Sequence, residues 1–145
     1  MPFMKFLIIL LSIALTQKSC ENTNKSQEDL SIEYAAVSRG VFNQVNINYK
    51  EITAINKRGE KPVKSNVSNT EWRQLTALLK TIDTENLDKL EAPSKRFQFD
   101  GVAIATLTIN YKGNTYKSPS FDHGNPPKEI AQLVNKILSI SENIE

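Results

Sequence analysis

A short apolar run near the N-terminus most limits what this chain can fold into. Residues Phe6–Leu15 are apolar except for Ser12, with Lys5 before them and the polar residues Thr16–Lys18 after them. Ten residues are too few for a membrane-spanning helix, which needs about 20 apolar residues. A buried core helix is the alternative, but a short apolar core behind a positive charge is typical of a secretory signal peptide. We therefore expect residues 1–19 to be removed.

The only cysteine of the chain, Cys20, directly follows this segment. The stretch Leu15–Cys20, with Ser19 before the cysteine, resembles the lipobox of bacterial lipoproteins in the looser form of Bacteroidota-like proteins. The resemblance implies that Cys20 carries acyl chains such as palmitate and anchors the chain in the cell envelope, in the outer membrane and on its periplasmic or surface face. Two or three chains make such an anchor durable, because each buried methylene contributes about 0.8 kcal/mol. The alternative is a stray cysteine near an ordinary secretory cleavage site.

A polar tract follows the cysteine. Residues 21–29 include no apolar side chain and cannot bury enough surface to order themselves, so we expect 20–31 to be a flexible tether. Residues 32–141 then form a single globular domain. Without Lys5 and Lys18 of the signal peptide, the 18 basic and 16 acidic residues of the chain become 16 and 16. A nearly neutral mature chain lacks the basic surface that nucleic-acid binding needs, so we expect no nucleic-acid partner.

The first half of the domain has the alternation of β-strands. Val45–Tyr49 alternates strictly between apolar and polar residues, and Ile32–Ser38 and Ile52–Ile55 alternate more loosely. Pro62 introduces a fourth run, Val63–Ser65, which we expect at the edge of the sheet because proline cannot donate to a central ladder. This half is therefore predicted to be an antiparallel meander.

Two helices are predicted after this meander, with strands between them. Ser68 and Glu71 have the spacing of a capping box, and an apolar stripe begins at Trp72. Asn125–Pro127 is typical of a second helix start, and an apolar stripe follows it from Ile130 to Leu138. The intervening strands are Val102–Tyr111 and Thr115–Ser118, joined by a hairpin turn at Gly113. The prediction is an α+β domain of about five to six antiparallel strands with two main helices on one face, in the order β-β-β-(β)-α-β-β-α.

The segment Phe121–Pro127 is the most unusual in the domain and contains the only histidine, His123. A zinc site needs three or four ligands, and the domain has no cysteine, no second histidine and no HxxH spacing, so we expect no metal and no cofactor. One interpretation is structural: Asp122 accepts backbone donors in the turn, Gly124 allows an unusual backbone and Asn125 caps the last helix. The other is that Phe121, Asp122 and His123 contact a partner.

A second candidate partner site lies in the early turn Ser38–Phe42. An exposed Arg39 with an aromatic neighbour, Phe42, is typical of loops that bind proteins, although a bulge with Phe42 in the core is the alternative. A hydrolase using Asp100, Asp122 and His123 would require these side chains to meet. Because no GxSxG motif, P-loop or Cys/His pair is present, we expect no enzymatic activity.

The layout of the domain resembles a known class of inhibitor. An Arg-Gly-Val-Phe turn at Arg39–Phe42, a capped helix with Trp72, a strand after Asp100–Gly101 and a closing helix are similar in order to the emfourin-type inhibitors of thermolysin-like metalloproteases, over most of Ile32–Ile140. The whole chain also resembles small lipoproteins of Flavobacteria-like bacteria.

These resemblances imply a non-enzymatic binding module of the cell envelope, with protease inhibition as a special case. It would bind membrane lipid through acylated Cys20 and a protein or peptide through its loops. The alternatives are a structural or accessory envelope protein and a hydrolase.

Overall fold

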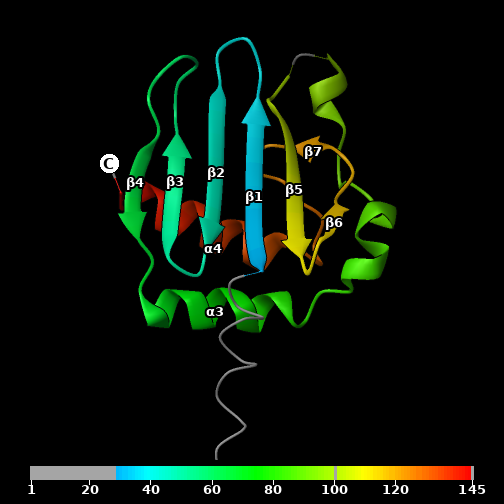
Figure 1. Cartoon of the computed structure of the whole chain (residues 1–145). Coiled ribbons are helices and arrows are strands. Elements are labelled where there is room, and N and C mark those ends of the chain that lie inside the picture. Colours follow the sequence, from blue (N-terminus) through cyan, green and yellow to red (C-terminus); the bar gives the residue numbers. More distant parts are fainter. Residues whose placement is uncertain (1–28, 100, 145) are drawn as a thin grey trace, which may run out of the picture.

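The computed structural model describes residues 29–99 and 101–144. The predicted signal peptide, the predicted lipidation site Cys20 and the tether as far as residue 28 lie outside the described residues, as does Asp100. The described part is an α+β fold in which α4 lies behind one antiparallel sheet and α3 crosses beneath its lower end (Figure 1). The predicted fold class is therefore confirmed.

The sheet has seven strands: β1 (Leu30–Val37), β2 (Phe42–Asn48), β3 (Glu51–Ile55), β4 (Val63–Asn66), β5 (Ile104–Tyr111), β6 (Asn114–Lys117) and β7 (Phe121–Asp122). Their order across the sheet is β4-β3-β2-β1-β5-β6, and β7 pairs with β5. The first four strands form the predicted meander, with β4 at the edge, and β1 starts two residues before the predicted domain boundary. The additional strand, β7, is only two residues long and therefore too short to show an alternating pattern.

The central pair of strands joins the two halves of the chain. β5 runs antiparallel to β1 along the full length of both strands, from Leu30 opposite Tyr111 to Val37 opposite Ile104. In β1 every second residue from Leu30 is buried, and the same alternation holds at Ala105, Leu107 and Ile109 of β5. Because successive side chains of a strand point to opposite faces, one face of the sheet forms the core and the other faces solvent.

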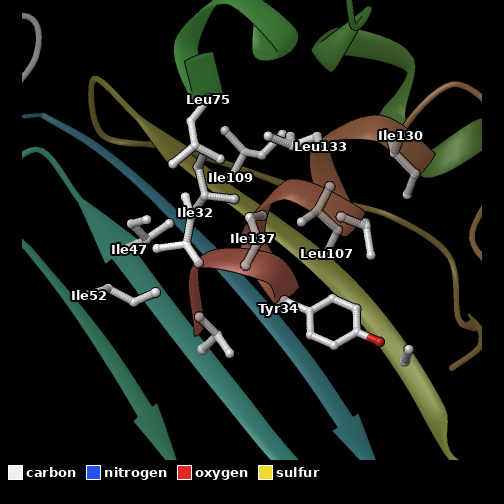
Figure 2. Close-up of a cluster of buried hydrophobic side chains, with 14 of the residues drawn as sticks. Ile32, Tyr34, Ile47, Ile52, Leu75, Leu107, Ile109, Ile130, Leu133 and Ile137 are labelled. Atoms are coloured by element: carbon white, nitrogen blue, oxygen red, sulfur yellow. The ribbon is translucent and has the colours of Figure 1, made fainter. Parts of the chain in front are cut away.

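The core lies between the sheet and the helices. Ile32 and Ile47 of the sheet face Ile137 of α4, and Leu75 of α3 reaches the same cluster from one end (Figure 2). The buried apolar residues with the largest side chains are Trp72, Tyr34, Phe121, Ile32, Ile47, Ile52, Leu75, Leu87, Leu107, Ile109, Ile130 and Leu133. Each such side chain contributes about 1.5–3 kcal/mol through removal from water.

Helix α3 (Asn69–Leu79) begins at the predicted capping box. The backbone N–H of Glu71 donates to Ser68 Oγ at 3.2 Å, and the backbone N–H of Ser68 donates to Glu71 Oε2 at 3.0 Å. These hydrogen bonds satisfy two donors that the helix start would otherwise leave free. The hydrogen bonds from Ser68 also hold the pKa of Glu71 below its ordinary value. Trp72 and Leu75 are the buried residues of this helix, as its apolar stripe indicates.

Two short 3-10 helices, η1 (Thr84–Lys89) and η2 (Arg96–Phe99), connect α3 to β5. Leu87 of η1 is buried, and Leu90 is partly buried against the core. The hairpin between β5 and β6 agrees with the prediction. Its two turn residues, Lys112 and Gly113, have φ values of 50° and 79°. Positive φ at both positions is the geometry of a type I′ turn, which matches the twist of the strands.

The last helix, α4 (Ala131–Glu142), starts later than predicted, and Asn125 is not its cap. The backbone N–H of Asn125 donates to Asp122 O at 2.8 Å, and its side chain donates to Ser94 Oγ at 2.8 Å. Asn125 is therefore part of a turn after β7. The residue that precedes the helix is Ile130, whose N–H donates to Pro127 O at 3.1 Å.

Candidate functional site

The predicted loops gather at one end of the sheet, which we call the loop end. It consists of the connections 38–41 and 56–62, together with residues 121–125, and lies at the top of Figure 1. Strand β1 begins at Leu30 at the opposite end and finishes at the loop end. An eight-residue strand separates the two ends by about 25 Å.

The turn between β1 and β2 presents Arg39 at its tip. Ser38 Oγ accepts hydrogen bonds from the backbone N–H groups of Gly40 at 3.3 Å and Val41 at 3.0 Å, which hold the turn in shape while Arg39 stays exposed. Phe42 pairs with Val37 in a regular ladder and is half-buried on the solvent-facing side of the sheet. The alternative of a bulge with Phe42 in the core is therefore wrong.

The carboxylate of Asp122 is a buried structural acceptor. It accepts hydrogen bonds from Ser94 Oγ and from the backbone N–H groups of Arg96 at 3.1 Å and Phe97 at 2.8 Å. Burial by itself would raise the pKa of Asp122, but these hydrogen bonds and the charge of Arg96 outweigh it and hold the pKa below its ordinary value. Asp122 thus joins β7 to η2, as the structural interpretation expected, although the donors come from a distant segment.

Two of the predicted partner-binding residues are inaccessible to a partner. Phe121 is fully buried and Asp122 is 2% exposed. Both lie in β7, which pairs with Ile104 and Ala105 of β5, and they are therefore buried. The prediction that Phe121 and Asp122 form an exposed contact surface is therefore wrong. The local sequence did not indicate this burial, because a two-residue strand has the composition of a loop.

His123 bonds to the core through Tyr34. The Oη atom of Tyr34 lies 2.6 Å from His123 Nδ1, and the backbone N–H of His123 donates to Ala103 O at 3.0 Å. Tyr34 is fully buried, so its hydroxyl proton needs this partner, and burial raises its pKa well above the ordinary value. The hydroxyl therefore donates to Nδ1 of the imidazole.

The structure does not bring Asp122 and His123 together as an acid and a base. The carboxylate of Asp122 is directed to residues 94–97, while the ring of His123 is directed to Tyr34. In Figure 2 the oxygen of Tyr34 points away from the other labelled side chains, toward the edge of the core cluster. The geometry of these two residues thus gives no support to the hydrolase interpretation.

A cavity of about 460 Å³ opens beside His123 at the loop end. Its lining combines the β1–β2 turn, the residues after β7 and the last turns of α4: Gly40, Val41, Phe42, Asn43, Asn56, His123, Gly124, Leu138, Ser141 and Glu142. A smaller hollow of about 110 Å³ shares Gly40, Val41, Phe42 and Asn56 with it and is completed by Ser38, Arg39, Lys57 and Arg58. Of the predicted site residues, Phe42 and His123 therefore line the larger cavity, and Arg39 and Phe42 line the smaller hollow beside it.

Sequence analysis missed Asn43, Leu138 and Glu142 as members of this site. Asn43 could have been identified from the sequence, because it occupies a core-facing position of β2 two residues before the buried Val45. A polar residue at an inward position needs a hydrogen-bond partner, and Asn43 Oδ1 is buried without one among the described residues. No local pattern indicates Leu138 and Glu142 as site residues, since they lie about a hundred residues from the turn that they face.

Among residues 29–99 and 101–144, no group of three or more histidine, cysteine or acidic side chains is placed to hold a metal ion. No helix of this described part is long and apolar enough to cross a membrane. Comparison of the chain with protein-family models, with curated proteins and with solved structures found no match.

Proposed function

We propose that this chain is a lipid-anchored binding module of the bacterial cell envelope, which holds a protein or peptide partner at the loop end of its sheet. The observation that carries the proposal is the cavity of about 460 Å³ lined by the β1–β2 turn, His123 and α4. Pockets in which apolar walls accompany a few polar groups are the usual places for recognition. Here Val41 and Leu138 are apolar residues of the lining.

The position of the cavity suits a tethered module. The folded part begins at Leu30, at the end of β1 opposite the loop end. The nine residues between Cys20 and Leu30 span at most about 30 Å when extended. An anchor at Cys20 would hold the N-terminal end of the sheet toward the membrane, so that the loop end is presented away from it.

Protease inhibition is the special case suggested by the likeness in layout to emfourin-type inhibitors. Such an inhibitor would insert an exposed loop into a protease cleft. The β1–β2 turn with Arg39 and Val41 is an exposed loop whose shape is held by hydrogen bonds to Ser38 Oγ. A structural or accessory envelope protein is the second candidate, for which the polar, solvent-facing side of the sheet offers a surface of a different kind.

Site-specific photo-crosslinking in intact cells tests the proposal. A photoreactive phenylalanine at position 41 should form a discrete adduct, and the same residue at exposed Lys80, at the end of α3, should not. Gly40→Trp should abolish the adduct, because Gly40 lines the cavity and a Cβ added there meets no atom within 4 Å, so that the turn can accept a bulky side chain. Lys80→Trp is the matched control.

The anchor is tested in the same cells. Intact mass of the purified protein should correspond to a chain that begins at acylated Cys20, and Cys20→Ala should release it from the membrane. Adducts that form equally from positions 41 and 80, or that persist in Gly40→Trp, would refute binding at the loop end. An unacylated soluble product would refute the lipid anchor alone.

A further inference from the structure

The loop end is strongly basic although the chain as a whole is not. The connections 38–41 and 56–62 carry four basic residues and one acidic residue, all exposed, whereas the full chain has 18 basic and 16 acidic residues. The acidic residue, Glu60, lies 3.3 Å from Lys57 and pairs with it. Arg39, Arg58 and Lys61 therefore remain as positive charges on these two connections, and Glu142 is the acidic residue in the lining of the cavity.

Exposed apolar side chains gather at the same end. Val37, Phe42 and Ile104 lie side by side on the solvent-facing side of the sheet, because Val37 pairs with both of the others. The guanidinium of Arg58 lies 5.4 Å from the centre of the Phe42 ring, so charge and apolar surface are interleaved. Of the six large apolar residues that are exposed in the described part, only Tyr111 lies at the opposite end; the others are Val37, Val41, Val63, Phe99 and Ile104.

The cavity adds polar groups to this surface. Tyr34 holds His123 at Nδ1, and the lining also includes Asn43, Ser141 and Glu142. A peptide group has one acceptor and one donor and can form hydrogen bonds with polar side chains of this kind.

From these three features we infer that the partner is a polypeptide segment in which a large apolar residue is flanked by acidic residues. The inference rests on the proposed function and names the chemistry of what the same site binds. The apolar residue enters the cavity beside Val41 and Leu138, while the acidic residues face Arg39 and Arg58 over the neighbouring hollow. Charge complementarity of this kind selects the partner and accelerates association.

The test uses the full chain, purified in detergent, and a fluorescein-labelled peptide with one phenylalanine between two pairs of glutamates. Fluorescence anisotropy should show binding that weakens as salt is raised. A peptide with lysines in place of the glutamates should not bind, and a peptide with alanine in place of phenylalanine should bind at least about fivefold more weakly.

Charge reversal locates the binding surface. Arg39→Glu with Arg58→Glu should weaken binding of the acidic peptide about tenfold. Lys80→Glu with Lys117→Glu changes the net charge equally at exposed residues outside the loop end and should change binding less than twofold. Circular dichroism of each variant verifies that it is folded.

Several outcomes would overturn the inference. They are equal binding of the glutamate and lysine peptides, equal weakening by the two charge-reversal pairs, or binding to phosphatidylglycerol vesicles without binding to the peptide. The last outcome would assign the loop end to an anionic membrane surface. A crosslinked protein at position 41 together with no binding of the acidic peptide would refute this partner chemistry while the proposed function stands.

Discussion

Replacing Tyr34 by phenylalanine removes one hydroxyl group from the base of the candidate site and leaves the ring in place. The hydroxyl bonds His123 Nδ1 at 2.6 Å, and such a bond contributes about 0.5–1.5 kcal/mol net. His123 is only partly buried, so water can reach the nitrogen that loses its partner. We therefore expect Tyr34→Phe to lower the free energy of unfolding by about 1 kcal/mol, and Tm by roughly 4–6 °C.

His123→Ala should have a larger effect, because it leaves the fully buried hydroxyl of Tyr34 without an acceptor, which costs about 1–3 kcal/mol. In that background, Tyr34→Phe removes the unsatisfied group and should be neutral or stabilising. Thermal and urea denaturation of the four proteins measures the coupling. If Tyr34→Phe lowered stability by the same amount in both backgrounds, the assigned hydrogen bond would be refuted.

The same residue predicts an alkaline effect. Burial raises the pKa of Tyr34 in the folded protein above its unfolded value of about 10. The folded state therefore keeps its proton where the unfolded state loses it, and the stabilisation is complete below pH 10 and declines as pH rises above it. Tyr34→Phe should lose less stability than the parent protein between pH 9 and pH 11. Parallel stability curves over this range would contradict a buried, protonated Tyr34.

Three further predictions concern the stability of the fold. Asp122→Asn should lower Tm at pH 7, because an amide cannot accept hydrogen bonds from all three donors. Below about pH 4 the parent protein should lose stability more steeply than the variant, because the pH then falls toward the lowered pKa of Asp122 in the folded state. Ser68→Ala should cost about 1 kcal/mol in urea denaturation by removing the cap of α3, whereas an unchanged midpoint would show that the capping box is dispensable. Leu107→Ala should cost about 2–5 kcal/mol because Leu107 is fully buried, whereas Thr106→Ala, one residue away on the other face, should stay within about 0.5 kcal/mol.

Local patterns predicted most of the elements. The alternation of β1 to β3, the proline before β4, the capping box of α3 and the glycine of the β5–β6 hairpin each depend on residues within a few positions of one another. The start of α4 was placed too early for the same local reason. Asn125–Pro127 is typical of a helix start, but Asn125 takes its partners from Asp122 and Ser94.

The candidate site was predicted only in part. Arg39, Phe42 and His123 line two adjoining hollows at the loop end, but Phe121 and Asp122 were assigned to the surface although they are buried in β7. The composition of a short segment indicates that it is unusual, but it does not tell which side chains are buried. That depends on what pairs with the segment, here a strand some seventeen residues earlier in the chain.

The sequence by itself determined most of the elements, their amphipathic faces and hence an antiparallel sheet with helices on one side. Only the tertiary structure decided that β5 pairs with β1, that Asp122 bonds η2 and that His123 bonds Tyr34, which lies 89 residues away. The physical reason is that periodicity and capping arise from near neighbours in the chain. Hydrogen bonds between distant side chains depend on how complete elements pack, and no local pattern records that.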